Sequence, residues 1–126
     1  MKITKTVYLA GKIAGDESYR SKFKAAANML GLAGFAVINP AMLPPEGFAY
    51  AAYMRMGAAM LEECEAVCFL PDWNESEGAI AEMKLARELG IEIFYYDDWL
   101  KELKQIKSGM RKAFKEAGAN GLQYAT

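Results

Sequence analysis

Residues 66–90, AVCFLPDWNESEGAIAEMKLARELG, contain a strand, a polar loop and a helix in succession. The first five residues are apolar without alternation, which is typical of a strand buried on both faces. Apolar residues then recur at helical spacing until Gly90, a residue type that commonly follows a helix C-terminus. A strand followed by a helix is the repeating unit of a parallel α/β sheet.

The same unit repeats on both sides of this stretch. Apolar runs at residues 7–10, 35–38 and 91–95 predict three further strands, each followed, directly or after a loop, by a helical pattern. The alternation predicts an α/β fold with a single doubly wound parallel sheet, four strands in the order 2-1-3-4 and helices on both faces, as in flavodoxin-like and Rossmann-like proteins. We assign residues 1–118 to this one domain and expect residues 119–126 to form a mobile tail.

Composition excludes several classes of function. The chain has 126 residues, of which 53% are apolar and 25% charged, as expected for a globular protein. A net charge of -1, with acidic residues interrupting the lysines of the last helix, argues against a nucleic acid partner. No apolar run approaches the length that spans a bilayer, and the first residues do not resemble a signal peptide. We therefore expect a cytoplasmic protein with no membrane partner.

The chain lacks histidine and has only two cysteines, Cys64 and Cys68. The lack of histidine excludes Ser-His-Asp and Cys-His triads, and two cysteines alone cannot complete a four-ligand zinc site. We expect no metal and no cofactor. Any catalysis would depend on carboxylates, lysine, tyrosine, hydroxyl groups or backbone amides.

Ligands of such a sheet bind beyond the carboxyl ends of its strands, at the switch point between the first and third strands. The loops at 11–16 and 72–78 are expected to meet there. GKIAG at 11–15 and SEG at 76–78 both offer backbone amides near a helix N-terminus, which favours an anion such as phosphate. A tight glycine turn explains the first segment equally well, and Lys12 is either a phosphate partner or an ordinary loop lysine. The candidate substrate-binding residues are Gly11, Lys12, Ile13, Gly15, Asn39, Asn74, Ser76 and Gly78.

Glu82 falls inside the apolar arc of the helix that begins near residue 76. A carboxylate there is unfavourable unless a partner or a wet cleft accommodates it, and the alternative is a boundary glutamate that reaches solvent. Asp72, in the loop before the helix, supplies a second carboxylate. Two carboxyl groups in unlike environments, one as nucleophile and one as proton donor, are the usual equipment for cleaving a glycosidic bond.

Two segments resemble a known family. VYLAGKIAG, residues 7–15, resembles the first strand and loop of the nucleoside 2-deoxyribosyltransferase superfamily, which includes deoxynucleoside 5′-monophosphate N-glycosidases. SEGAIAE, residues 76–82, resembles the nucleophile segment of that superfamily. With NPA at 39–41 and CEAV at 64–67, the pattern looks closest to a poorly characterised bacterial and phage subfamily.

The resemblance implies that Glu82 is the nucleophile and that Tyr8 orients it. Ser76 falls where transferases acting on free nucleosides carry Asp, and where the monophosphate glycosidases carry a phosphate-binding Ser. Lys12 departs from the small hydroxyl residue of the monophosphate glycosidases, so recognition of a phosphate is left open.

We therefore expect an enzyme that cleaves or transfers the N-glycosidic bond of a nucleoside or its 5′-monophosphate, with Glu82, Asp72 and Tyr8 as catalytic residues. A non-catalytic nucleotide-binding module on the same scaffold is the alternative, and a structural subunit is a third hypothesis. The helix at 48–63 carries tyrosine and methionine on more than one side, which predicts a homodimer or larger homo-oligomer with this helix in the interface. The resembled superfamily also builds its sites at subunit boundaries, which implies the same.

Overall fold

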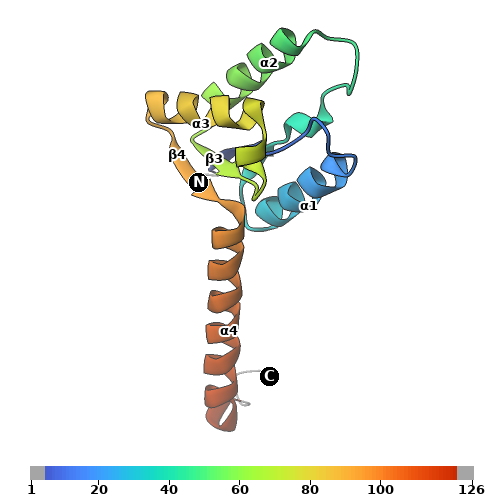
Figure 1. Ribbon diagram of the computed structural model, residues 1–126. Helices are drawn as coiled ribbons and strands as arrows, with labels where there is room; N and C mark the ends of the chain where they lie inside the picture. The colour runs from blue at the N-terminus through green and yellow to red at the C-terminus, as the bar shows by residue number, and fades with distance from the viewer. Residues whose placement is uncertain (1–4, 122–126) are drawn as a thin grey trace. The chain divides into compact units, whose positions relative to one another are not determined.

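The computed structural model describes residues 5–121, and the side chains of residues 5–117. Its sheet has four parallel strands in the order β2-β1-β3-β4, which confirms the predicted topology (Figure 1). No helix within the described residues is long and apolar enough to cross a membrane. The elements in chain order are β1 (Thr6–Ala10), α1 (Tyr19–Leu32), β2 (Ala36–Ile38), the 3-10 turn η1 (Pro40–Met42), α2 (Tyr50–Glu62), β3 (Ala66–Phe69), the 3-10 turn η2 (Trp73–Glu75), α3 (Glu77–Leu89), β4 (Glu92–Tyr95) and α4 (Tyr96–Gly121).

The chain divides into two compact units. The first, Met1–Tyr96, contains the whole sheet with α1, α2 and α3, and the second, Asp97–Thr126, contains nearly all of α4. The domain boundary suggested by the sequence at residue 118 falls inside α4. Of the expected tail, residues 122–126 lie outside the described residues.

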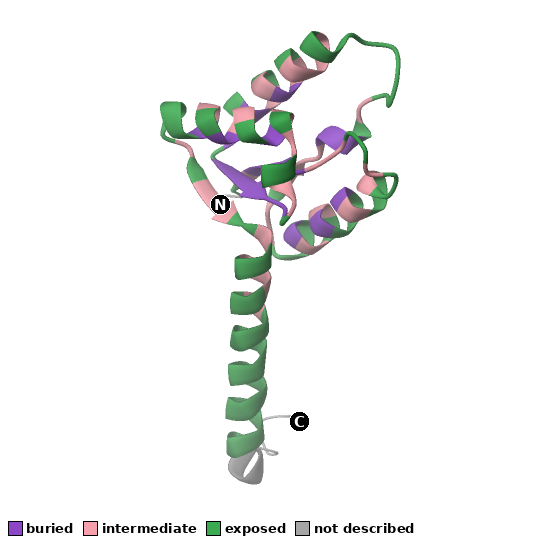
Figure 2. Cartoon of the chain, viewed as in Figure 1, coloured by how far each residue is buried: buried purple, intermediate pink, exposed green. Residues whose placement is uncertain are grey.

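The centre of the sheet is the buried core of the first unit (Figure 2). Every residue of β3 is buried, and so is every residue of β1 except Thr6. Side chains of a strand alternate between its two faces. One face packs against α2 and α3, whereas α1 covers the other (Figure 1). The strand residues in the cluster with α2 and α3 are Tyr8, Ala10, Val67 and Phe69.

Both ends of α3 are set by local sequence signals. Ser76 is the N-cap, and its Oγ accepts a hydrogen bond from the Ala79 amide at 3.2 Å. Gly90 ends the helix with a φ of 67°, a left-handed conformation that glycine adopts without strain. These two ends place Glu82 in the second turn of α3.

Candidate active site

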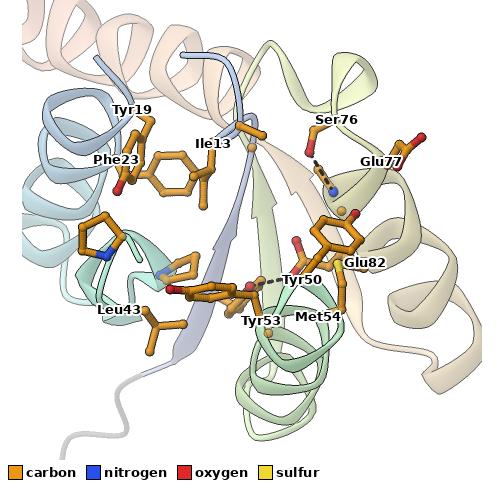
Figure 3. A pocket seen from close by; sticks show the side chains of 18 of the residues that line it. Ile13, Tyr19, Phe23, Leu43, Tyr50, Tyr53, Met54, Ser76, Glu77 and Glu82 are labelled. Carbon is orange, nitrogen blue, oxygen red and sulfur yellow. Dashed lines mark hydrogen bonds between the residues drawn. The ribbon is translucent and has the colours of Figure 1, made fainter. Parts of the chain in front are cut away.

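A pocket of about 500 Å³ opens in the first unit, beside the carboxyl end of β1 (Figure 3). Its walls come from the loop after β1, the start of α1, the segment between η1 and α2, α2 itself and the first turns of α3. Small-molecule sites in proteins commonly have volumes of roughly 300–1,000 Å³. This is also the end of the sheet at which folds of this topology bind ligands.

Tyr8 and Glu82 form a hydrogen-bonded pair in the wall of this pocket. Tyr8 lies in β1 with only 1% of its surface exposed, and its hydroxyl donates to Oε2 of Glu82 (Figure 3). Glu82 reaches the pocket from α3, and its Oε1 accepts no hydrogen bond from the described residues. One carboxylate oxygen is therefore held in place, and the other is available to a ligand.

Burial changes the acidity of both members of the pair. Removal from water raises the pKa of Glu82 from 4.5 to about 7, and the hydrogen bond from Tyr8 opposes that rise. Burial, followed by the charge of Glu82, raises the pKa of Tyr8 far above its ordinary value. The tyrosine thus keeps its proton as a donor, while the carboxyl group titrates near neutrality.

Gly57 of α2 leaves the space that the pair occupies. A Cβ atom at this position would lie 2.9 Å from Oε2 of Glu82 and 3.1 Å from the hydroxyl of Tyr8. Both distances are tighter than those of ordinary van der Waals contacts, so any other residue here would displace the carboxylate or the helix. Gly57 is not among the site residues predicted from the sequence. The one feature that could have indicated its role is its position inside a helix, where glycine is unfavourable unless packing requires it.

The remaining lining is acidic, aromatic and apolar. Tyr19 and Phe23 lie on one side of the pocket, and Tyr50 and Met54 lie on the other (Figure 3). Glu75, Glu77 and Glu82 are the charged members, and none of the described residues that line the pocket is lysine or arginine. A phosphate group would therefore meet carboxylates in this pocket, and the lysine beside them, Lys12, lies outside the lining and already pairs with Glu75.

Residues 5–95 match the family model described as "Domain of unknown function (DUF4406)". The chain belongs to this family. The matched range contains all four strands and every residue that lines the pocket, whereas α4 follows it. No curated protein and no solved structure matches the chain. The description of the DUF4406 family names no activity, so the resemblance to nucleoside 2-deoxyribosyltransferases stays a prediction.

In this DUF4406 chain Asp72 does not share the pocket with Glu82. Its Oδ1 accepts a hydrogen bond from the Lys12 amide at 3.0 Å, and its Oδ2 pairs with Nζ of Lys22. Lys22 also pairs with Oδ2 of Asp16 at 2.6 Å and donates to the carbonyl of Lys12 at 2.9 Å. The loops after β1 and β3 do meet, but Asp72 joins them as a structural partner. The catalytic role of Asp72 stays a prediction.

The other predicted binding residues separate into two groups. Gly11, Ile13, Ser76 and Gly78 line the pocket. Lys12, Gly15, Asn39 and Asn74 do not, and the structure gives three of them other surroundings. Nζ of Lys12 lies 3.4 Å from Glu75, Gly15 turns the loop with a φ of 79°, and Oδ1 of Asn39 caps η1 by accepting from the Ala41 amide at 2.9 Å. Asn74 is exposed in η2.

Proposed function

We propose that this protein cleaves or transfers the N-glycosidic bond of a free nucleoside, with Glu82 as the nucleophile. The observation that carries this assignment is the pair in the pocket wall, a carboxylate fixed by a buried tyrosine and open to the cavity through its other oxygen. A carboxylate in that setting is suited to attack an anomeric carbon, through a transition state that resembles an oxocarbenium ion.

The proposed reaction has two steps. Oε1 of Glu82 forms a bond to the anomeric carbon as the carbon–nitrogen bond breaks, and the base leaves with the electron pair and gains a proton from water. Water or a second base then attacks the same carbon, loses a proton and releases the Glu82 carboxylate. Tyr8 donates to Oε2 throughout and keeps the carboxylate oriented.

The charge of the pocket favours a nucleoside over its 5′-monophosphate. Ser76 supplies one hydroxyl group at the N-terminus of α3, and a hydrogen bond from it to a charged group contributes ~1.5–3 kcal/mol. Two like charges 5 Å apart repel by about 3 kcal/mol at an effective dielectric constant of 20. Of the three carboxylates in the lining, Glu75 pairs with Lys12 from outside it, whereas Glu77 and Glu82 form no ion pair with the described residues. Repulsion therefore outweighs the attraction that Ser76 offers a phosphate. The aromatic rings of the lining offer stacking surfaces for a base.

The test is release of free base from a panel of ribo- and deoxyribonucleosides and their 5′-monophosphates, separated by liquid chromatography. We expect release from at least one nucleoside, and at least tenfold less from the matching monophosphate. Glu82→Gln should abolish release while the ligand still binds, because the substitution removes the nucleophile and keeps its shape. Glu88→Gln is the matched control, since Glu88 is exposed on the same helix and does not line the pocket.

Two results would contradict the assignment. Binding of nucleosides without base release by the unmodified protein would identify a non-catalytic binding module instead. Equal release by the unmodified protein and by Glu82→Gln would exclude Glu82 as the nucleophile.

A further inference from the structure

The helix α4 has the apolar spacing of a coiled coil. From Leu103 onwards its apolar residues recur at alternating intervals of three and four, which is the a and d pattern of a heptad repeat. These a and d residues are Leu103, Ile106, Met110, Ala113 and Ala117. The outward b, c and f positions between them are polar throughout: Lys104, Gln105, Ser108, Arg111, Lys112 and Lys115.

The middle of this apolar stripe is exposed in the structure. Ile106 is 59% exposed and Met110 65%, and Phe114, which borders the stripe at an e position, is 81% exposed. Helices in proteins derive most of their stability from packing an apolar face, and Gly109 lowers the intrinsic stability of this one further. The helix therefore requires a partner surface along this stripe.

We propose that the partner is α4 of a second copy of this chain, in a parallel, in-register coiled coil. In that arrangement each g residue lies beside the e residue of the following heptad of the other copy. Glu102 is at g and Lys107 at the following e position, so two Glu102–Lys107 pairs form across the two-fold axis. An antiparallel pairing centred on Gly109 would instead bring Glu102 against Glu116, which are both acidic.

The next g and e positions provide a second, independent fit. They are Gly109 and Phe114, so the parallel arrangement lays the ring of Phe114 against a position without a side chain. An added Cβ at Gly109 would meet nothing within 4 Å, and Phe114 is almost fully exposed. A large residue at e and a glycine at g, each unfavourable in a lone helix, are complementary in this dimer.

Charge reversal tests this arrangement in the full-length chain. Glu102→Lys and Lys107→Glu each place like charges across the two-fold axis, and the double variant restores opposite charges. Within one helix, Glu102→Lys introduces an attraction to Asp98, and Lys107→Glu introduces one to Arg111. Neither single variant should therefore destabilise an isolated helix, so any loss of association comes from the contact between copies.

We expect sedimentation to show a dimer of the unmodified chain whose dissociation constant rises about tenfold in each single variant and returns in the double variant. Ala113→Cys should form a disulfide between copies under mild oxidation, because equal d positions face each other only in a parallel, in-register pair. A monomeric unmodified chain at 100 µM, a dimer that the single variants leave unchanged, or a double variant that stays dissociated would each overturn the inference. Far-UV circular dichroism of each variant verifies that the helix remains folded.

Discussion

At the scale of the residue, the site depends on space as much as on charge. Glu82 and Tyr8 can form their hydrogen bond inside the protein because α2 presents a glycine to them. Burial raises the pKa of the carboxyl group to about 7. The space left by the missing side chain at Gly57 therefore controls both the position and the protonation of the proposed nucleophile.

Gly57→Ala should reduce base release by about 100-fold, because a displacement of the reacting group by about 1 Å typically has an effect of that size. The added Cβ would lie 2.9 Å from Oε2 of Glu82. Gly31→Ala in α1 is the control, since its added Cβ meets nothing within 4 Å and its catalytic effect should be absent. Steady-state rates of the two variants make the comparison, and equal rates would mean that Gly57 plays no part in positioning.

The rate of base release should rise with pH and reach its plateau above pH 7, because only the deprotonated carboxyl group is a nucleophile and its pKa is about 7. Below that value the rate should fall about tenfold per pH unit. Tyr8→Phe removes the hydrogen bond that lowers the pKa of Glu82, so the midpoint should move to higher pH. Tyr95→Phe, outside the pocket, should leave the profile unchanged. A Tyr8→Phe midpoint at lower pH would contradict the assigned role of the tyrosine.

At the scale of the element, the loops after β1 and β3 are joined by ion pairs around Lys22, which lies in α1. Hydrogen bonds from Lys22 and Ser18 lower the pKa of Asp16 from 3.8 to about 2. A carboxyl group whose pKa is lower in the folded state stabilises the fold above its unfolded pKa, and this contribution disappears as the pH falls through the folded pKa. The Asp16–Lys22 pair thus stabilises the loop after β1 at neutral pH and loses that effect between about pH 4 and pH 2.

Lys22→Met should lower the free energy of unfolding at pH 6, because it leaves Asp16 and Asp72 close together without their shared cation. The difference from the unmodified chain should shrink at pH 2, because the contribution of the Asp16–Lys22 pair falls as Asp16 takes up a proton. Urea unfolding at the two pH values measures this, with Lys24→Met on an exposed position of the same helix as the control. An equal loss of unfolding free energy at both pH values would show that the methylene chain of Lys22 stabilises the fold and that its charge does not.

The sequence predicted the secondary-structure elements and their order better than it predicted contacts between side chains that are distant in sequence. The alternation of apolar strands with amphipathic helices was enough for the sheet order, and the helical wheel placed Glu82 on the face that meets the sheet. The surroundings of Asp72 could not be predicted, because its partner, Lys22, is fifty positions away in sequence and approaches only after the loops fold. Gly57 was missed for the same reason, since the atoms that require a glycine come from β1 and α3.

At the scale of the whole molecule, the family match and the pocket both belong to the first unit, and the apolar stripe belongs to the second. The proposed ligand chemistry and the proposed association through α4 are therefore expected to be independent of each other. The prediction that α2 takes part in a homodimer remains a prediction. Phe48 and Tyr50 are exposed near the start of α2 and are available to such an interface.

A chain that ends at Tyr96 should retain base release within about twofold per chain and lose the association that depends on α4, because the residues of the pocket all precede that point. Turnover measurements and sedimentation of the truncated chain test the two expectations separately. Dimers that persist would assign an interface to the first unit. Loss of turnover in a truncated chain that retains its circular dichroism spectrum would mean that α4 contributes to the site.

The chain contains no histidine, and this makes the carboxyl group at the pocket unusually easy to observe. Burial raises the pKa of both cysteine thiols, that of Cys68 to about 12, so they do not titrate near neutrality either. A proton taken up or released by a side chain between pH 6 and pH 8 can then be assigned to Glu82. Calorimetry of ligand binding in buffers of different ionisation enthalpy would count that proton directly. Infrared spectroscopy would follow the carbonyl band of the protonated Glu82 carboxyl group without interference from imidazole.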